Sequence, residues 1–141
     1  MNREAIYAAL FNLLSSVPGI TTASRTTRHW DSVSPSEMPA LFQAQGKQIP
    51  ATLTNQPTRW TLGATIRLYV STDGAASPGA VANPIMDAIT ALFERPAACG
   101  PQTLGGLVIY ARIEGDVQTS EGSLGTLEVL EIPIRMLVPN V

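Results

Sequence analysis

The stretch Arg59–Ser71, RWTLGATIRLYVS, decides the fold class of this 141-residue chain. Its side chains alternate between two faces, the period-2 pattern of a β-strand that buries one of them. The larger apolar side chains share one face: Trp60, Leu62, Ala64, Ile66, Leu68 and Val70. The other face carries Thr61, Gly63, Thr65, Arg67 and Tyr69. At roughly 3.3 Å per residue this strand would span about 40 Å, so we expect part of it to project beyond the domain body.

Two helices are expected, one on either side of this strand in the sequence. Asn2 can cap a helix that runs to about Ser15, and Pro18-Gly19 ends it. A second helix is expected over residues 80–94, or from Asn83 as cap with Pro84 at the first helical position. In both segments the apolar residues recur at spacings of three and four, so each helix has one buried stripe.

The remaining strands have weaker patterns. They are expected at residues 21–28, 39–44, 107–114 and 127–138. The first is polar and predicts an edge strand, and Pro133 inside the last predicts an edge or a bulge there. Residues 46–58 and 115–126 are expected to be long polar loops that become ordered on assembly.

The order of elements predicts an α+β fold. Residues 1–141 are expected to form a single domain in the order α-β-β-β-α-β-β. The simplest arrangement is one mixed or antiparallel sheet of about five strands with both helices packed on one face, because each helix buries only one stripe.

The composition indicates a protein partly covered by other protein. Charged residues make up only 14% of the chain, whereas about 25% is usual. Lys47 is the sole lysine, and the formal net charge is −2. The lysines and arginines do not cluster in the sequence, so it does not predict binding to a nucleic-acid backbone. Cys99 is the sole cysteine, which agrees with a reducing cytoplasm, and we expect neither a signal peptide nor a membrane span.

No pattern in the sequence predicts an enzyme. His29 is the only histidine, and no HxxxH or CxxC spacing occurs for a metal site. Cys99 as a nucleophile would need a base, for which His29 is the only histidine candidate. No P-loop or dinucleotide fingerprint is present. We therefore expect no catalytic residues, no cofactor and no metal.

Charge and aromatic side chains predict the surfaces that meet partners. The candidate interface residues are Lys47, Arg59, Trp60, Glu114, Asp116, Glu121, Glu128 and Glu131. The five acids among them are expected on one hairpin, whereas most bases precede Val70. This acidic hairpin could meet a basic flank of a neighbouring subunit. It could instead line a central opening and repel DNA phosphates, or be an ordinary solvated face.

The order of several motifs resembles one family. These motifs are Trp30, Pro39-Ala40-Leu41-Phe42, the strand 60–70, the second helix with its proline, Thr103-Leu104-Gly105-Gly106-Leu107-Val108, Ile113-Glu114-Gly115 and Ile132-Pro133-Ile134. Together they resemble the lambda-type tail-terminator proteins of long-tailed bacteriophages, also called minor tail protein U or tail-completion proteins. The resemblance covers nearly the whole chain.

The resemblance implies a structural role in the virion. It implies a homohexameric ring, assembled in the host cytoplasm, at the head-proximal end of the tail. Such a ring caps the tail tube, ends its polymerisation and offers a surface to the head-completion or connector protein, while genomic DNA passes through without specific binding. Another connector ring of the same neck is the main alternative, and a soluble binding module with no phage role is the second.

Overall fold

The computed structural model describes residues 1–73, 77, 79–120 and 125–139 of the chain. Its helices and strands, in chain order, are α1 (Arg3–Ser15), β1 (Thr22–Ser24), β2 (Ala40–Ala51), β3 (Arg59–Ser71), α2 (Gly79–Phe93), β4 (Tyr110–Ile113), β5 (Gln118–Thr119) and β6 (Leu127–Leu137). Three short 3-10 helices lie between them: η1 (Trp30–Ser32), η2 (Pro35–Glu37) and η3 (Ala97–Cys99). The α+β class and the order of the main elements are confirmed.

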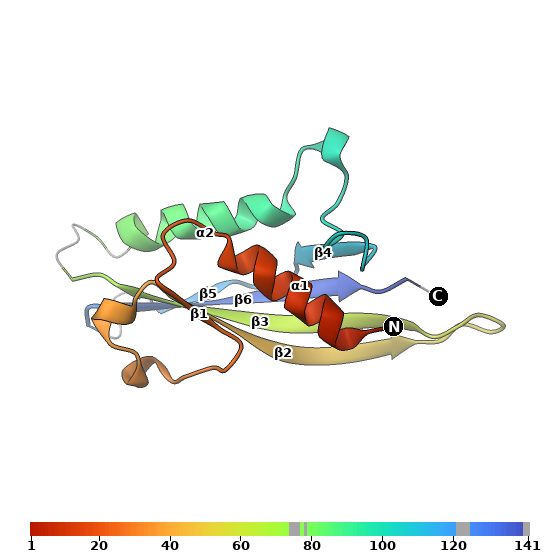
Figure 1. Ribbon diagram of the computed structural model, residues 1–141, viewed down its shortest axis with the longest axis horizontal. Coiled ribbons are helices and arrows are strands. Elements are labelled where there is room, and N and C mark those ends of the chain that lie inside the picture. Colours follow the sequence, from red (N-terminus) through yellow and green to blue (C-terminus); the bar gives the residue numbers. More distant parts are fainter. Residues whose placement is uncertain (74–76, 78, 121–124, 140–141) are drawn as a thin grey trace.

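The strands form one mixed sheet with both long helices on the same face (Figure 1). The strand order is β1-β2-β3-β6-β4, and β5 pairs with β6 further along the same edge as β4. Among the described strands, β1 and β2 run parallel and the other pairs are antiparallel. The strand predicted from its alternation, β3, therefore lies in the middle of the sheet.

The main core lies between the sheet and the helices. Side chains from the predicted face of β3, including Ile66 and Leu68, are fully buried there beside Ile132 of β6. Leu10 of α1 and Ile89 of α2 close this core from the helix side. The period-2 assignment of the two faces of β3 is thus confirmed, because the other face is more exposed at Thr61, Gly63, Thr65 and Arg67.

A second, smaller core covers one end of the opposite sheet face. Phe42, Tyr69 and Val129 are buried beneath the segment that runs from Trp30 to Met38. The Tyr69 hydroxyl donates a hydrogen bond of 2.7 Å to the Arg28 carbonyl, which ties the segment to the sheet. Among the described residues, no helix covers the rest of this face (Figure 1).

Residues 46–58 are not a long loop, contrary to the sequence prediction. Residues 46–51 continue β2 and pair with β3, so the turn is confined to residues 52–58. The prediction placed Pro50 in a loop because proline is rare within strands. Pro50 lies opposite Trp60 in the ladder between β2 and β3. The Trp60 carbonyl accepts a hydrogen bond from the Val138 amide, so the backbone groups of Trp60 point away from β2. The Pro50 nitrogen therefore faces the free edge of β2, and no ladder hydrogen bond is lost.

Pro133 is tolerated within β6 for the same reason as Pro50 in β2. Its carbonyl accepts a 3.1 Å hydrogen bond from the Glu114 amide, so its nitrogen also faces that edge of the strand. There the partner of β6 changes from β4 to β5, and Pro133 keeps its register opposite Thr65. The proline therefore sits at a local edge, as predicted.

Two further boundaries differ from the prediction, whereas the earlier of the two starts predicted for the second helix is confirmed. This helix begins at Gly79, one residue before Ala80, so Pro84 lies inside it and Asn83 is not its cap; Ala82 is fully buried. The strand expected at 107–114 begins only at Tyr110, because a tight turn with positive φ at Leu104 precedes it. The loop expected at 115–126 contains β5.

Candidate assembly surfaces

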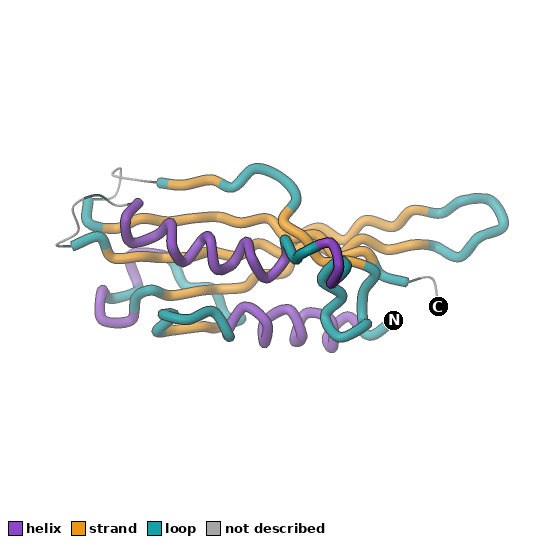
Figure 2. Tube along the Cα trace, turned by 90° about the horizontal axis from the view of Figure 1, so that it is seen from above, coloured by secondary structure: helices purple, strands orange, loops and turns teal. Residues whose placement is uncertain are grey.

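Strands β2 and β3 continue at one end of the sheet into a hairpin arm, here defined as Gly46–Leu62, whose base still contacts α1 and whose outer part projects beyond the helices (Figures 1 and 2). The arm begins where the register of β2 shifts between Gln45 and Gln48, a β-bulge. Gly63 makes this shift feasible, because a Cβ at that position would lie 2.7 Å from the Lys47 carbonyl oxygen. The expected projection of the long strand is confirmed.

The tip of the arm, Thr52–Thr58, is an ordered turn. The Gln56 amide donates to the Leu53 carbonyl at 3.1 Å, and Asn55 adopts a positive φ of 62°. The hydroxyls of Thr52 and Thr58 lie 2.8 Å apart across the base of the turn. Leu53 is 65% exposed at this tip.

The base of the arm is held by the first helix. The Arg3 guanidinium lies 4.7 Å from the centre of the Trp60 ring, a cation–π contact, and donates to the Gln48 side-chain carbonyl at 2.7 Å. The Tyr7 hydroxyl donates to the Gly63 carbonyl at 2.8 Å. Trp60, predicted as an interface candidate, is therefore partly buried at the junction between arm and domain.

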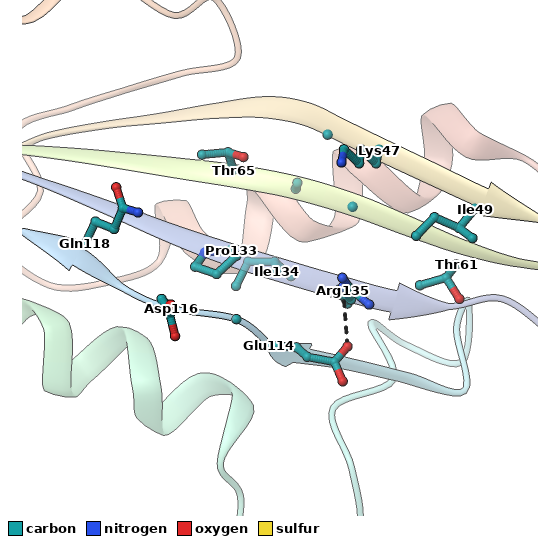
Figure 3. A pocket seen from close by; sticks show the side chains of 14 residues that line it. Lys47, Ile49, Thr61, Thr65, Glu114, Asp116, Gln118, Pro133, Ile134 and Arg135 are labelled. Atoms are coloured by element: carbon teal, nitrogen blue, oxygen red, sulfur yellow. Dashed lines mark ion pairs between the residues drawn. The ribbon is translucent and has the colours of Figure 1, made fainter.

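The uncovered sheet face holds an open groove of about 390 Å³ (Figure 3). Lys47 and Thr61 border it from the arm, Arg135 borders it from β6, and Glu114 borders it from the residues that follow β4. Glu114 forms ion pairs with Arg135 at 3.5 Å and with Arg112 at 2.8 Å. The groove is therefore a mixed-charge surface that a polar partner could cover.

A smaller pocket of about 280 Å³, here called the end pocket, is lined by the segment that contains η1 and η2. Its apolar lining comes from Trp30, Val33, Met38 and Leu127. Asp31 stands at its edge with a largely exposed carboxylate. His29 lies 2.7 Å from this carboxylate, and this hydrogen bond holds the pKa of Asp31 below its usual range.

The structure separates the acids that the sequence grouped on one hairpin. Glu114 and Asp116 border the open groove together with Lys47, whereas Glu131 pairs with Arg67 at 3.3 Å. Glu128 is only 2% exposed, so the prediction that it belongs to a solvated acidic surface is wrong. Glu128 lies on the same face of β6 as Leu130 and Ile132, so the period-2 alternation of this strand already places it on the buried side.

The two remaining candidate residues are Arg59 and Glu121. Arg59 is exposed at the outer end of the arm, and Glu121 lies outside the described residues. The sequence reasoning missed the end pocket altogether. The only sequence signal for this pocket is Trp30 followed closely by Val33 and Met38 in a polar segment. The prediction assigned Trp30 to the core by default, so this signal was not used.

The only histidine lies beside an acidic side chain. His29 contacts Asp31, and Asp31 in turn contacts the Ser32 hydroxyl at 3.3 Å, so the acid rather than the base is next to the serine. Within the described part of the chain, no three acidic, histidine or cysteine side chains gather as metal ligands. Neither long helix there is long and apolar enough to cross a membrane.

Comparisons with known proteins show a shared fold and no family. No protein-family profile and no curated protein matches the chain. One solved structure, whose title states no function, superposes with a TM-score of 0.55 at 17% identity and covers 99% of this chain and 96% of its own. A chain titled "Virion of native gene transfer agent (GTA) particle" covers 96% of this chain and 92% of its own, with a TM-score of 0.47 at 13% identity. The first likeness extends to the fold alone, and the second is too distant to indicate more.

Proposed function

We propose that this protein is a structural component of a phage virion that forms a ring at the end of the tail tube. In this role it ends tube polymerisation and presents a surface for head joining. The hairpin arm is the observation that carries the proposal. An isolated two-stranded hairpin is at best marginally stable in water, so an arm that leaves the domain is expected to contact another chain. The order of the sequence motifs, which resembles the tail terminators, gives the kind of assembly.

The open sheet face supports the same role. A tube grows because the upper face of each ring matches the lower face of the next, a heterologous contact that does not close. A terminator must match the last ring on one side and differ from it on the other. The open groove on the uncovered sheet face and the outer part of the arm form one continuous surface, because Lys47 and Thr61 of the arm border the groove, and the helices lie on the other face of the sheet (Figures 1 and 3).

The test is a tube-length assay with the phage's own tail-tube protein. We expect the protein to appear as hexameric rings, alone or on tube ends, and to shorten the tubes in proportion to its concentration. Electron micrographs and light scattering report both. Tubes of unchanged length and a protein that stays monomeric in their presence would contradict the proposal. Rings that bind the connector protein but never the tube would favour a neck connector instead.

A shortened arm is the matched variant for this assay. In this variant the two-residue turn Asn-Gly replaces Thr52–Thr58 and connects Ala51 to Arg59, which already pair across the hairpin. The core lies elsewhere, so the variant is expected to fold. We expect it to lose tube capping, because the proposed contacts lie on the removed tip or need its reach.

A further inference from the structure

We infer that the hairpin arm of one copy inserts Leu53 into the end pocket of a second copy, so that neighbouring subunits join head to tail. The inference deepens the proposed ring and rests on it. The tip and the 3-10 helices η1 and η2, whose residues line the end pocket, lie at opposite ends of the molecule's longest axis (Figures 1 and 2). A contact between two different surfaces is heterologous, and its repetition gives a closed ring when the rotation between subunits permits it.

The tip presents an apolar side chain on a rigid support. Leu53 has the largest exposed fraction, 65%, among the large apolar side chains of the described residues. Ile49, also on the arm, is 44% exposed. The hydrogen bond from Gln56 to the Leu53 carbonyl and the contact between the Thr52 and Thr58 hydroxyls order this turn before any partner arrives. A pre-ordered knob loses less conformational entropy on binding.

The end pocket has the size and lining that such a knob needs. Its volume of about 280 Å³ lies below the range of roughly 300–1,000 Å³ that is usual for small-molecule sites. Trp30 and Met38 are residue types enriched in interfaces. The ion pair of Arg28 with Glu37, and the Ser34 amide that donates to Glu37 at 3.2 Å, brace the segment that forms the pocket.

Charge at the two ends is complementary, and this favours a second copy as the occupant. Arg59 adjoins the tip, Lys47 lies at the base of the arm, and no acid occurs anywhere between Met38 and Thr72. Asp31 borders the pocket, and Asp73 is exposed on the turn that follows β3. Opposite charges on the two ends would steer the arm toward the pocket and disfavour contacts between two arms.

Paired cysteines test the contact directly. In a Cys99→Ser background, Leu53→Cys and Met38→Cys are combined and the protein is oxidised. The two positions are at opposite ends of one molecule, whereas a disulfide needs Cα atoms within about 7 Å, so a bond between them joins two copies. We expect a ladder of covalent oligomers from the double variant. Each single variant should give at most a dimer.

A second measurement uses association without cross-linking. Leu53→Asp is expected to weaken self-association by about tenfold to 100-fold, which corresponds to about 1.4–2.8 kcal/mol. Leu107→Asp is the matched control, because Leu107 is another exposed leucine, 40% exposed, away from the tip. It should associate like the parent. Sedimentation or light scattering over a concentration series gives the constants, and circular dichroism confirms that both variants fold.

The outcomes distinguish this inference from the proposed function. Rings without a ladder, and with Leu53→Asp assembling like the parent, overturn the inference and leave the terminator role standing. A ladder from a protein that never shortens tail tubes supports the inference and overturns the terminator role. Absence of both the ladder and any self-association, with or without tube protein, overturns the inference as well.

Discussion

Adjacent residues of β6 offer a sharp test of how the sheet is assembled, because their side chains lie on opposite faces. Ile132 is fully buried against the helices, whereas Glu131 is partly exposed on the other face and pairs with Arg67 at 3.3 Å. Ile132→Ala removes three buried carbon groups worth about 0.8 kcal/mol each in transfer free energy. The cavity left behind raises the expected loss of unfolding free energy to about 2–5 kcal/mol.

Glu131→Ala is the matched control one residue away. It removes an ion pair that is open to solvent, and such pairs contribute about 0.2–1 kcal/mol. Urea unfolding measures both variants. With a slope of about 2 kcal/mol per molar urea, Ile132→Ala should lower the midpoint by about 1–2.5 M, and the control by far less. Equal losses for the two variants, or a loss under about 0.5 kcal/mol for Ile132→Ala, would refute the face assignment.

Two further predictions concern the arm and the response to acid. Gly63→Val should cost about 1–3 kcal/mol in urea unfolding, because its Cβ would meet the Lys47 carbonyl oxygen, whereas Thr61→Val on the same face should stay within about 0.5 kcal/mol. A hydrogen bond from Arg28 holds the folded pKa of Glu37 below its usual range. Its stabilisation is therefore complete above the unfolded pKa of about 4.3 and is lost as pH falls through the folded value, so Glu37→Gln should flatten the acid limb of the stability profile.

The assembly surfaces show why charge patterns along a sequence need a structure to be interpreted. The sequence grouped five acids on one hairpin. In the structure, Glu114 pairs with Arg112 and Arg135 across two strands, and Glu128 is buried. Proximity in sequence did not place these carboxylates on one surface, because β6 exposes alternate residues to opposite faces and its neighbours determine which face is covered.

The sequence alone determined those features that depend on one segment and its own period. The alternation of β3 identified its buried face and its excess length, and the apolar stripes and Pro18-Gly19 located the first helix. These assignments hold because a strand or helix exposes its two sides by fixed local geometry. The α+β class followed because two one-sided helices need a sheet to cover their apolar stripes.

Only the tertiary structure decided features that depend on a partner strand. Residues 46–51 became strand because β3 extends far enough to pair with them, and Gly63 admits the bulge at Lys47. Pro50 is tolerated there because its nitrogen faces an unpaired edge, which only the register reveals. The end pocket likewise exists because the segment around Trp30 folds over the start of β6, about a hundred residues further along the chain. Such long-range contacts leave no periodic signal in either segment, since each segment's pattern records its own faces and not what covers them.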